Sequence, residues 1–192
     1  MTVRSSVPTE PSALDLLSAM RAGRLSPRDL MADTLDRIAA SDVNAVVSLR
    51  GRDSLLAEAS DPRPGPLSGL PMAIKDLADT AGIRTTYGHP AFADHVPHAD
   101  GPMAARLRAA GAIVIGKTNT PEFGLGSHSY NPVHGTTLNP WDKTRSAGGS
   151  SGGAGAALAA RLVALADGSD MMGSLRNPAA WNNVFGLRPT QG

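Results

Sequence analysis

The stretch from Gly148 to Pro178 limits what this chain can fold into more than any other segment does. It reads GGSSGGAGAALAARLVALADGSDMMGSLRNP, so two turns that contain glycine and serine, residues 148–153 and 170–174, enclose an apolar segment. Each turn leads into a segment that can begin a helix, where free backbone N–H groups favour negative charge. The chain therefore places two serine-bearing helix starts at the ends of one apolar segment.

The apolar segment between these turns predicts one helix followed by one strand. Residues 152–161 favour a helix, and Leu162 to Ala166 is an apolar run with the length of a buried strand. A helix that runs outward and a strand that returns would each cover roughly 15 Å at their usual rise per residue. We therefore expect Ser150 and Ser174 to lie at the same edge of the fold.

The remaining elements predict an α/β fold. Short apolar strands alternate with helices, which favours a mixed, largely parallel sheet flanked by helices. The expected helices cover residues 12–22, 27–40, 53–60 and 102–110, and the expected strands cover residues 43–49, 70–74 and 113–115. We divide the chain into an N-terminal helical region, residues 1–60, which packs on the core, and an α/β core, residues 61–192.

Composition excludes several classes of protein. A net charge of +1 gives no electrostatic attraction for nucleic acid or a membrane surface. No segment approaches the ~18 uncharged apolar residues that a membrane span needs, and the first residues lack the apolar region of a signal peptide. The absence of cysteine excludes disulfides and thiolate chemistry. We predict a cytoplasmic protein that binds neither nucleic acid nor a membrane.

Lys75 stands out because it ends an apolar run in a chain whose other lysines are Lys117 and Lys143. A serine nucleophile needs a base, and no histidine follows the serine turns. A lysine can serve if burial lowers its pKa from about 10.4 by roughly 3 units. A lysine at a strand end is also typical of one that pairs with its neighbour, here Asp76, or extends to solvent. Spacing alone leaves both interpretations open.

Competing motifs fit less well. Gly149 to Gly153 matches G-x-S-x-G, but a nucleophile elbow needs an apolar strand before it and a histidine after it. Here the polar residues 142–145 precede the motif, and no histidine follows. The glycines match neither the dinucleotide-binding pattern nor the P-loop, and Ser-x-x-Lys is absent. These alternatives are therefore rejected.

The histidines all lie in predicted loops before Ser150. We expect them to be exposed to solvent, because no carboxylate or cysteine cluster has metal-ligand spacing, and we expect no metal site. His128 and Tyr130 are candidates for the lining of a cleft. The five histidines are His89, His95, His98, His128 and His134.

The two serine turns and Lys75 together resemble the amidase signature family of serine hydrolases. That family includes simple amidases, fatty-acid amide hydrolases and the A subunit of tRNA-dependent amidotransferases. Its signature covers Gly148 to Ala179 and is matched throughout except at Met172, where the family has Gly or Ala. The resemblance extends over residues 70–76, 116–119 and 186–190. It implies the family's α/β fold and hydrolysis of an amide C–N bond without a metal or organic cofactor.

The resemblance also implies a role for each matched residue. Ser174 resembles the nucleophile that forms an acyl-enzyme. Ser150 resembles the serine that follows a cis peptide bond and relays the proton, and Lys75 resembles the catalytic base. Ser151 resembles an auxiliary serine in the same hydrogen-bond network.

The nucleophile loop is expected to supply the oxyanion hole and its support. The resemblance implies that the backbone N–H groups of Met171, Met172, Gly173 and Ser174 form the hole. A glycine at position 172 would permit a positive φ, which a methionine resists. Asp170 and Arg176 resemble a pair that braces this loop. The alternative is that they form a local ion pair without a chemical role.

The sequence ends just after its Gly-Leu-Arg-Pro-Thr motif, where members of the resembled family continue for more than this length again. We interpret it as the N-terminal half of the family's fold, with all three triad residues inside it. Three functions follow: an amidase acting on a small-molecule amide, a truncated remnant that at most binds a partner, and the A-type component of an amidotransferase. The expected protein partners are another copy of the chain or a complementing C-terminal half.

Overall fold

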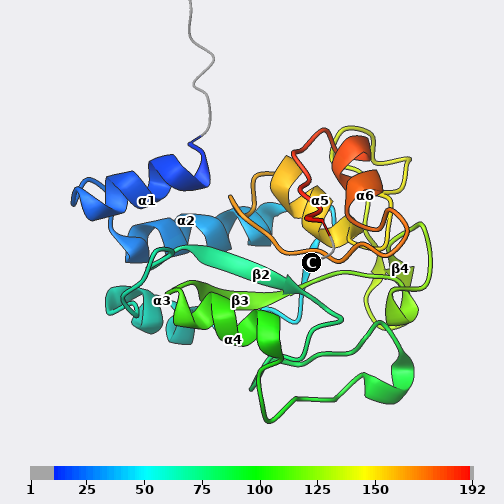
Figure 1. Cartoon of the computed structure of the whole chain (residues 1–192), viewed down its shortest axis with the longest axis horizontal. Helices are drawn as coiled ribbons and strands as arrows, with labels where there is room; N and C mark the ends of the chain where they lie inside the picture. The colour runs from blue at the N-terminus through cyan, green and yellow to red at the C-terminus, as the bar shows by residue number, and fades with distance from the viewer. Residues whose placement is uncertain (1–10, 191–192) are drawn as a thin grey trace, which may run out of the picture.

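A computed structural model describes residues 11–190 of the chain and places a three-stranded mixed sheet at its centre (Figure 1). Strand β2 (Pro71–Lys75) runs parallel to β3 (Ile113–Thr118), and β1 (Val46–Val47) runs antiparallel to β3. The sheet order is β1-β3-β2, so β2 lies at one edge. The α/β fold with a mixed sheet is therefore confirmed.

The helices begin where the sequence supplies capping groups. Ser12 forms a capping box with Asp15, and Ser26 accepts a hydrogen bond from the backbone of Asp29 one residue before Pro27. The helices are α1 (Ala13–Arg21), α2 (Pro27–Ala40), α3 (Arg52–Ser60), α4 (Pro102–Ala109), α5 (Gly152–Ala159) and α6 (Arg176–Trp181), with short 3₁₀ turns at Pro90–Phe92 and Glu122–Gly124.

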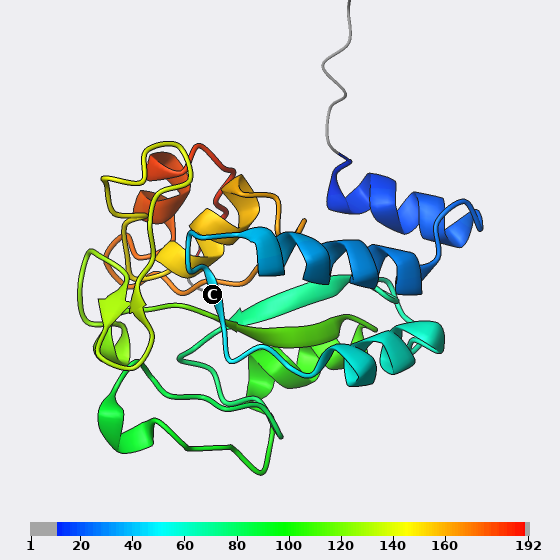
Figure 2. The same cartoon turned by 180° about the vertical axis from the view of Figure 1, so that it is seen from behind.

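Alternate residues of the sheet contribute to two hydrophobic clusters. Ile74 and Val114 face α4, where they pack with Ala104. Ala73 and Ile113 belong to the larger cluster on the other face, which α2, α3 and α5 cover. Figures 1 and 2 show α4 on the side of the sheet opposite to α2. The larger cluster joins both predicted regions of the chain: Met31, Leu35, Leu55, Ala73, Ile115, Ala156 and Leu162 are among its members. The division at residue 60 stays a prediction.

The predicted strand at Leu162–Ala166 is wrong. This segment has no regular structure, and Arg161 before it adopts a positive φ of 58°. A strand requires backbone hydrogen bonds to a neighbour, and within residues 11–190 no strand pairs with this segment. The apolar run is still partly buried, because Leu162 and Val163 belong to the main core.

The segment from residue 120 to residue 147 is mostly irregular. It contains one short hairpin, β4 (Tyr130–Asn131) with β5 (Gly135–Thr136). Farther along, the indole N–H of Trp141 donates to the carbonyl of Asn182, 2.7 Å away, which fixes the segment beside the end of α6. In the described part of the chain, no helix is long and apolar enough to cross a membrane.

Candidate active site

Lys75 lies at the end of β2 with 2% of its surface exposed, and its amine is surrounded by serine hydroxyls. Its Nζ atom lies 2.7 Å from Ser150 Oγ, 2.9 Å from Ser151 Oγ and 2.9 Å from Ser169 Oγ. The alternative in which Lys75 pairs with Asp76 or reaches solvent is therefore not what the structure shows. Ser169, which precedes the Asp170 turn by one residue, was not predicted from the sequence.

Burial lowers the pKa of Lys75 to about 8 because desolvation disfavours the ammonium form. The negative charges of Asp167 and then Asp170 oppose this shift, since an anion nearby favours the protonated amine. A lysine with this pKa has a substantial neutral fraction near pH 8, whereas an exposed lysine has almost none. Lys75 can thus act as a base near neutral pH.

Ser150 and Ser151 differ in what their hydroxyl groups can do. Ser151 Oγ accepts from the backbone N–H of Ser169 and lies 3.3 Å from the Ser169 carbonyl, to which it can donate. By contrast, Lys75 Nζ is the one hydrogen-bond partner found for Ser150 Oγ among residues 11–190. A hydroxyl that relays a proton must not commit it to a carbonyl, so the geometry favours Ser150 as the relay.

Ser150 follows a cis peptide bond from Gly149, which is the bond that the resemblance implies. Close contacts explain the glycines on both sides of the serine pair. A Cβ atom on Gly149 would lie 2.6 Å from the backbone nitrogen of His128, and one on Gly152 would lie 2.4 Å from Ser129 Oγ. The buried Ser129 hydroxyl in turn accepts from the N–H of Gly152 at 2.9 Å and donates to the carbonyl of Ser150 at 3.3 Å.

Ser174 is held beside this turn through its backbone. Its carbonyl accepts a hydrogen bond from the N–H of Ser151 at 2.9 Å, so the two serine-bearing turns meet although the predicted returning strand is absent. The residue is half-buried. In the described part of the chain, no hydrogen-bond partner is found for its Oγ atom. The structure therefore holds the Ser174 backbone against Ser151, whereas in the described residues no hydrogen bond joins its hydroxyl to Ser150 or Lys75.

Asp170 holds the nucleophile loop together. Its buried carboxylate accepts from the backbone N–H of Gly173 at 2.7 Å and from that of Arg176 at 3.2 Å, and it forms an ion pair with the guanidinium of Arg176 at 2.9 Å. These bonds, the Arg176 side chain first, hold the pKa of Asp170 well below its usual range. Asp170 and Arg176 thus occupy positions from which they can brace the loop.

The Met172 position does not force a strained backbone. The positive φ of the loop falls on Gly173, at 106°, and Met172 is absent from the residues with positive φ. The side chains of Met171 and Met172 are both 87% exposed, so neither fills the space beside Ser174.

Among the backbone N–H groups expected to form the oxyanion hole, that of Gly173 already donates to Asp170. Within residues 11–190, the N–H groups of Met171, Met172 and Ser174 have no protein acceptor, which leaves them available to an oxyanion.

Replacement of Asp170 by asparagine is expected to destabilise the protein by about 3 kcal/mol at pH 7, because buried backbone donors and Arg176 lose a charged acceptor. The pKa of Asp170 is lower in the folded state than in the unfolded state. Its contribution to the free energy of unfolding is therefore fully present above the unfolded-state pKa of about 4, and it is lost as the pH falls below that value. Urea unfolding at several pH values measures both effects.

The exposed Asp142→Asn variant is the matched control. Asp142 also pairs with an arginine, Arg145, at 2.9 Å, but both side chains face solvent. We expect little or no change in stability for this pair, because solvent screens exposed ion pairs. Equal effects of the two substitutions, or a larger difference at pH 3 than at pH 7, would contradict the bracing role of Asp170.

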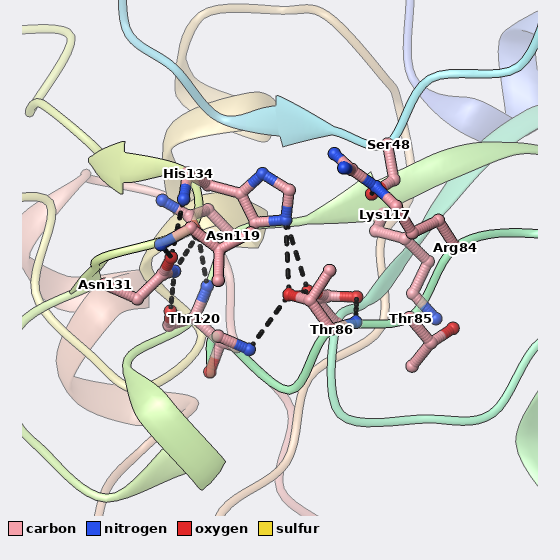
Figure 3. Close-up of polar contacts among 12 residues, drawn as sticks. Ser48, Arg84, Thr85, Thr86, Lys117, Asn119, Thr120, Asn131 and His134 are labelled. Carbon is pink, nitrogen blue, oxygen red and sulfur yellow. Dashed lines mark hydrogen bonds and ion pairs between the residues drawn. The ribbon is translucent and has the colours of Figure 1, made fainter. Parts of the chain in front are cut away.

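A second buried polar cluster surrounds the carboxylate of Asp76. The Asp76 carboxylate accepts from the backbone N–H of Thr86 at 3.0 Å and from its hydroxyl at 2.5 Å. Figure 3 shows His134 directed toward Thr86, with Nε2 at 3.3 Å from Thr86 Oγ1, and Nε2 also lies 3.6 Å from Asp76 Oδ2. The side chain of His134 is 6% exposed. The expectation that His134 is a solvent-exposed loop histidine is therefore wrong.

Lys117, on β3, is the other fully buried lysine. Its amine donates to the carbonyl of Ala78 at 2.5 Å and to the hydroxyl of Thr80 at 2.9 Å, so it fixes the turn that follows Lys75. Burial lowers the pKa of Lys117 to about 8, against the opposing charges of Asp76 and Asp167. Nothing in the sequence distinguishes this structural lysine from Lys75 except its position.

An apolar groove of about 440 Å³ adjoins the site. Two of its lining residues, Ser151 and Asp167, are hydrogen-bonded to Lys75. Mostly apolar side chains line the rest: Leu158, Leu165, Leu175, Val184 and Phe185. His128 and Tyr130, the predicted cleft residues, border a different, smaller hollow of about 160 Å³.

In residues 11–190, no group of three or more His, Cys, Asp or Glu side chains could hold a metal ion.

Comparison with known proteins places this chain in a family. The Amidase family model matches residues 29–192. The chain belongs to the amidase family. Among solved structures, it resembles the peptide amidase from Stenotrophomonas maltophilia with a TM-score of 0.81 and 36% sequence identity, covering 91% of this chain and 39% of that chain. It resembles a fatty acid amide hydrolase with a TM-score of 0.83 and 30% identity, covering 90% of this chain and 32% of that chain.

The sequence relatives include two kinds of protein. The A subunit of the glutamyl-tRNA(Gln) amidotransferase of Saccharolobus solfataricus is 42% identical over 183 residues, which are 93% of this amidase-family chain and 38% of the relative. The indoleacetamide hydrolase of Bradyrhizobium diazoefficiens is 44% identical over 190 residues, 94% of this chain and 36% of the relative. The chain thus spans less than two fifths of the length of each of these two relatives.

Proposed function

We propose that this chain carries the catalytic residues of a serine amidase that hydrolyses a carboxylic amide. The observation on which the proposal rests is the buried amine of Lys75 at 2.7 Å from Ser150 Oγ, with the pKa of Lys75 lowered to about 8 by burial. Ser174 is held beside this pair by its backbone bond to Ser151. A neutral amine, a relay hydroxyl and an uncommitted serine are the parts that acyl transfer requires.

In the proposed first half-reaction, the Ser174 oxygen attacks the amide carbonyl carbon. Its proton passes to Ser150 as the proton of Ser150 passes to the neutral amine of Lys75. The carbonyl oxygen becomes an oxyanion, which the free N–H groups of Met171, Met172 and Ser174 can stabilise. The C–N bond then breaks as Ser150 returns a proton to the leaving nitrogen and Lys75 reprotonates Ser150.

In the second half-reaction, water attacks the ester formed on Ser174. The same two groups remove its proton, and the carboxylic acid leaves as Ser174 recovers its hydrogen. Every proton transfer in this sequence uses groups of the protein or water. Ser151 does not carry a proton in it, because its hydroxyl supports the Ser169 turn.

Labelling with a fluorophosphonate probe tests the proposal directly. We expect one covalent adduct on the 192-residue chain by intact mass, located at Ser174 by peptide mapping and absent from Ser174→Ala. A folded sample that takes up no probe would contradict the proposal and favour the catalytically inactive alternative. An adduct at another serine would contradict the assignment of the nucleophile.

A role as the A-type component of an amidotransferase is a second candidate function, and the 42% identity to the Saccharolobus solfataricus protein favours it. Substrate preference separates the two candidates. Release of ammonia from glutamine would favour the amidotransferase function, whereas release from an arylacetamide such as indoleacetamide would favour a simple amidase. A partner, either another copy or a complementing C-terminal half, and a cytoplasmic location stay predictions.

A further inference from the structure

We propose that Asp167 is a positioning residue that anchors Lys75 to the edge of the sheet and sets the charge state of its amine. This inference rests on the proposed function, in which Lys75 is the base. Asp167 lies in the irregular segment between α5 and the nucleophile loop, outside the serine turns.

Asp167 bonds to the backbone of Lys75. Strand β2 is an edge strand, so its free edge presents backbone N–H groups without a neighbouring strand. Asp167 Oδ1 accepts the N–H of Lys75 at 2.7 Å and thereby takes the place of a strand carbonyl. Two residues later, Ser169 Oγ lies 2.9 Å from the amine of the same lysine. The segment therefore holds Lys75 at both its backbone and its side-chain end.

Asp167 also dominates the charges around Lys75. It is the carboxylate that most strongly favours the ammonium form of Lys75, followed by Asp170, whose own charge is balanced by Arg176. On β3, Lys117 is a second cation that interacts electrostatically with Asp167. Asp76, the residue after Lys75, directs its carboxylate to Thr86, and α5 contributes mainly glycine and alanine.

Three groups favour the anionic form of Asp167, against the larger effect of its burial. Burial raises the pKa of its carboxyl, and the Lys75 N–H, Lys117 and the Lys75 amine oppose this shift. One carboxyl group thus interacts electrostatically with two buried lysines. When Lys75 gives up its proton, Lys117 still balances the charge of Asp167, so the neutral base does not leave an unpaired buried anion.

Asp167→Asn separates the charge of this residue from its hydrogen bond. Asparagine keeps an oxygen that can accept the Lys75 N–H, but it removes the negative charge. Because an anion near an amine favours the ammonium form, its removal lowers the pKa of Lys75. We expect a shift of about one unit downward, which raises the neutral fraction about tenfold at pH 6.

Lysine titration by NMR measures this shift without reference to activity. The chain has only three lysines, so a sample labelled with ¹³C-lysine gives three ε-carbon signals that single substitutions can assign. Lys143, at the surface beside Asp42, is the internal reference. We expect the midpoint of Lys75 to fall by about one unit in Asp167→Asn and to stay in place in the exposed Asp142→Asn control.

Labelling of Ser174 across the same pH range tests the functional consequence. We expect the Asp167→Asn variant to react about tenfold faster than the wild type at pH 6 and at a similar rate above pH 9. An unchanged Lys75 midpoint in the variant overturns the inference. A shifted midpoint without faster labelling supports the role of Asp167 but contradicts Lys75 as the base, so failure of the proposed function is distinguished from failure of this inference.

Discussion

Replacement of Lys75 by methionine is expected to slow fluorophosphonate labelling of Ser174 by about 10³-fold at pH 8, because the general base is lost while the nucleophile remains. Methionine is close to lysine in length and is tolerated in apolar surroundings, so it fills the buried position without a charge. Rates are measured by intact mass over time. The wild-type rate should rise with pH up to about pH 8, where Lys75 becomes neutral, and the variant should lack this rise.

Lys143→Met is the matched control for this experiment. It makes the same change at the surface, where the amine of Lys143 pairs with Asp42 at 2.6 Å, and it should leave the labelling rate unchanged. Thermal unfolding of both variants shows whether the chain remains folded. A folded Lys75→Met variant that reacts within tenfold of the wild type would mean that a group other than Lys75 is the final proton acceptor.

The helices and the buried strands were predictable because their signals are local. Ser12 and Ser26 mark helix starts through short-range capping bonds, and the apolar runs before Lys75 and Lys117 become β2 and β3. The prediction failed at Leu162–Ala166, where composition favours a strand. Whether an apolar run becomes a strand depends on a partner elsewhere in the chain, which composition does not specify.

The candidate site was predictable where a residue belongs to a continuous motif. Lys75, Ser150 and Ser174 were predicted as candidates because two serine turns and a strand-end lysine make a recognisable pattern, and the structure brings their segments together. Ser169 and Asp167 were missed because their importance depends on contacts with Lys75, more than 90 positions away.

The wrong prediction for His134 has a similar cause. His134 lies in a loop, and loop residues are usually exposed. Its burial depends on Asp76 and Thr86, which come from the segment after β2 and are about 50 positions away in the sequence. Long-range contacts of this kind are the part of the site that a single sequence does not specify.

Gly153→Ala is expected to destabilise the protein by about 3 kcal/mol or more, since overpacking a close backbone contact forces elements apart. Helix propensity alone would predict that this substitution stabilises the protein, because alanine is favoured over glycine by about 1 kcal/mol inside a helix. Gly153 lies in the first turn of α5, however, and a Cβ atom there would lie 2.2 Å from the backbone nitrogen of Asn119. The Gly153 N–H also donates to the Asn119 carbonyl at 3.2 Å.

The measurement is the urea unfolding midpoint, with Gly51→Ala as the matched control. Gly51 precedes α3 with an ordinary φ of −60°, and a Cβ atom there meets nothing within 4 Å, so this change should stay within about 0.5 kcal/mol. A Gly153→Ala variant as stable as the wild type would mean that α5 does not pack directly on the end of β3. That packing fixes the turn with Ser150 and Ser151 against the strand next to Lys75, so the same substitution should also slow labelling of Ser174.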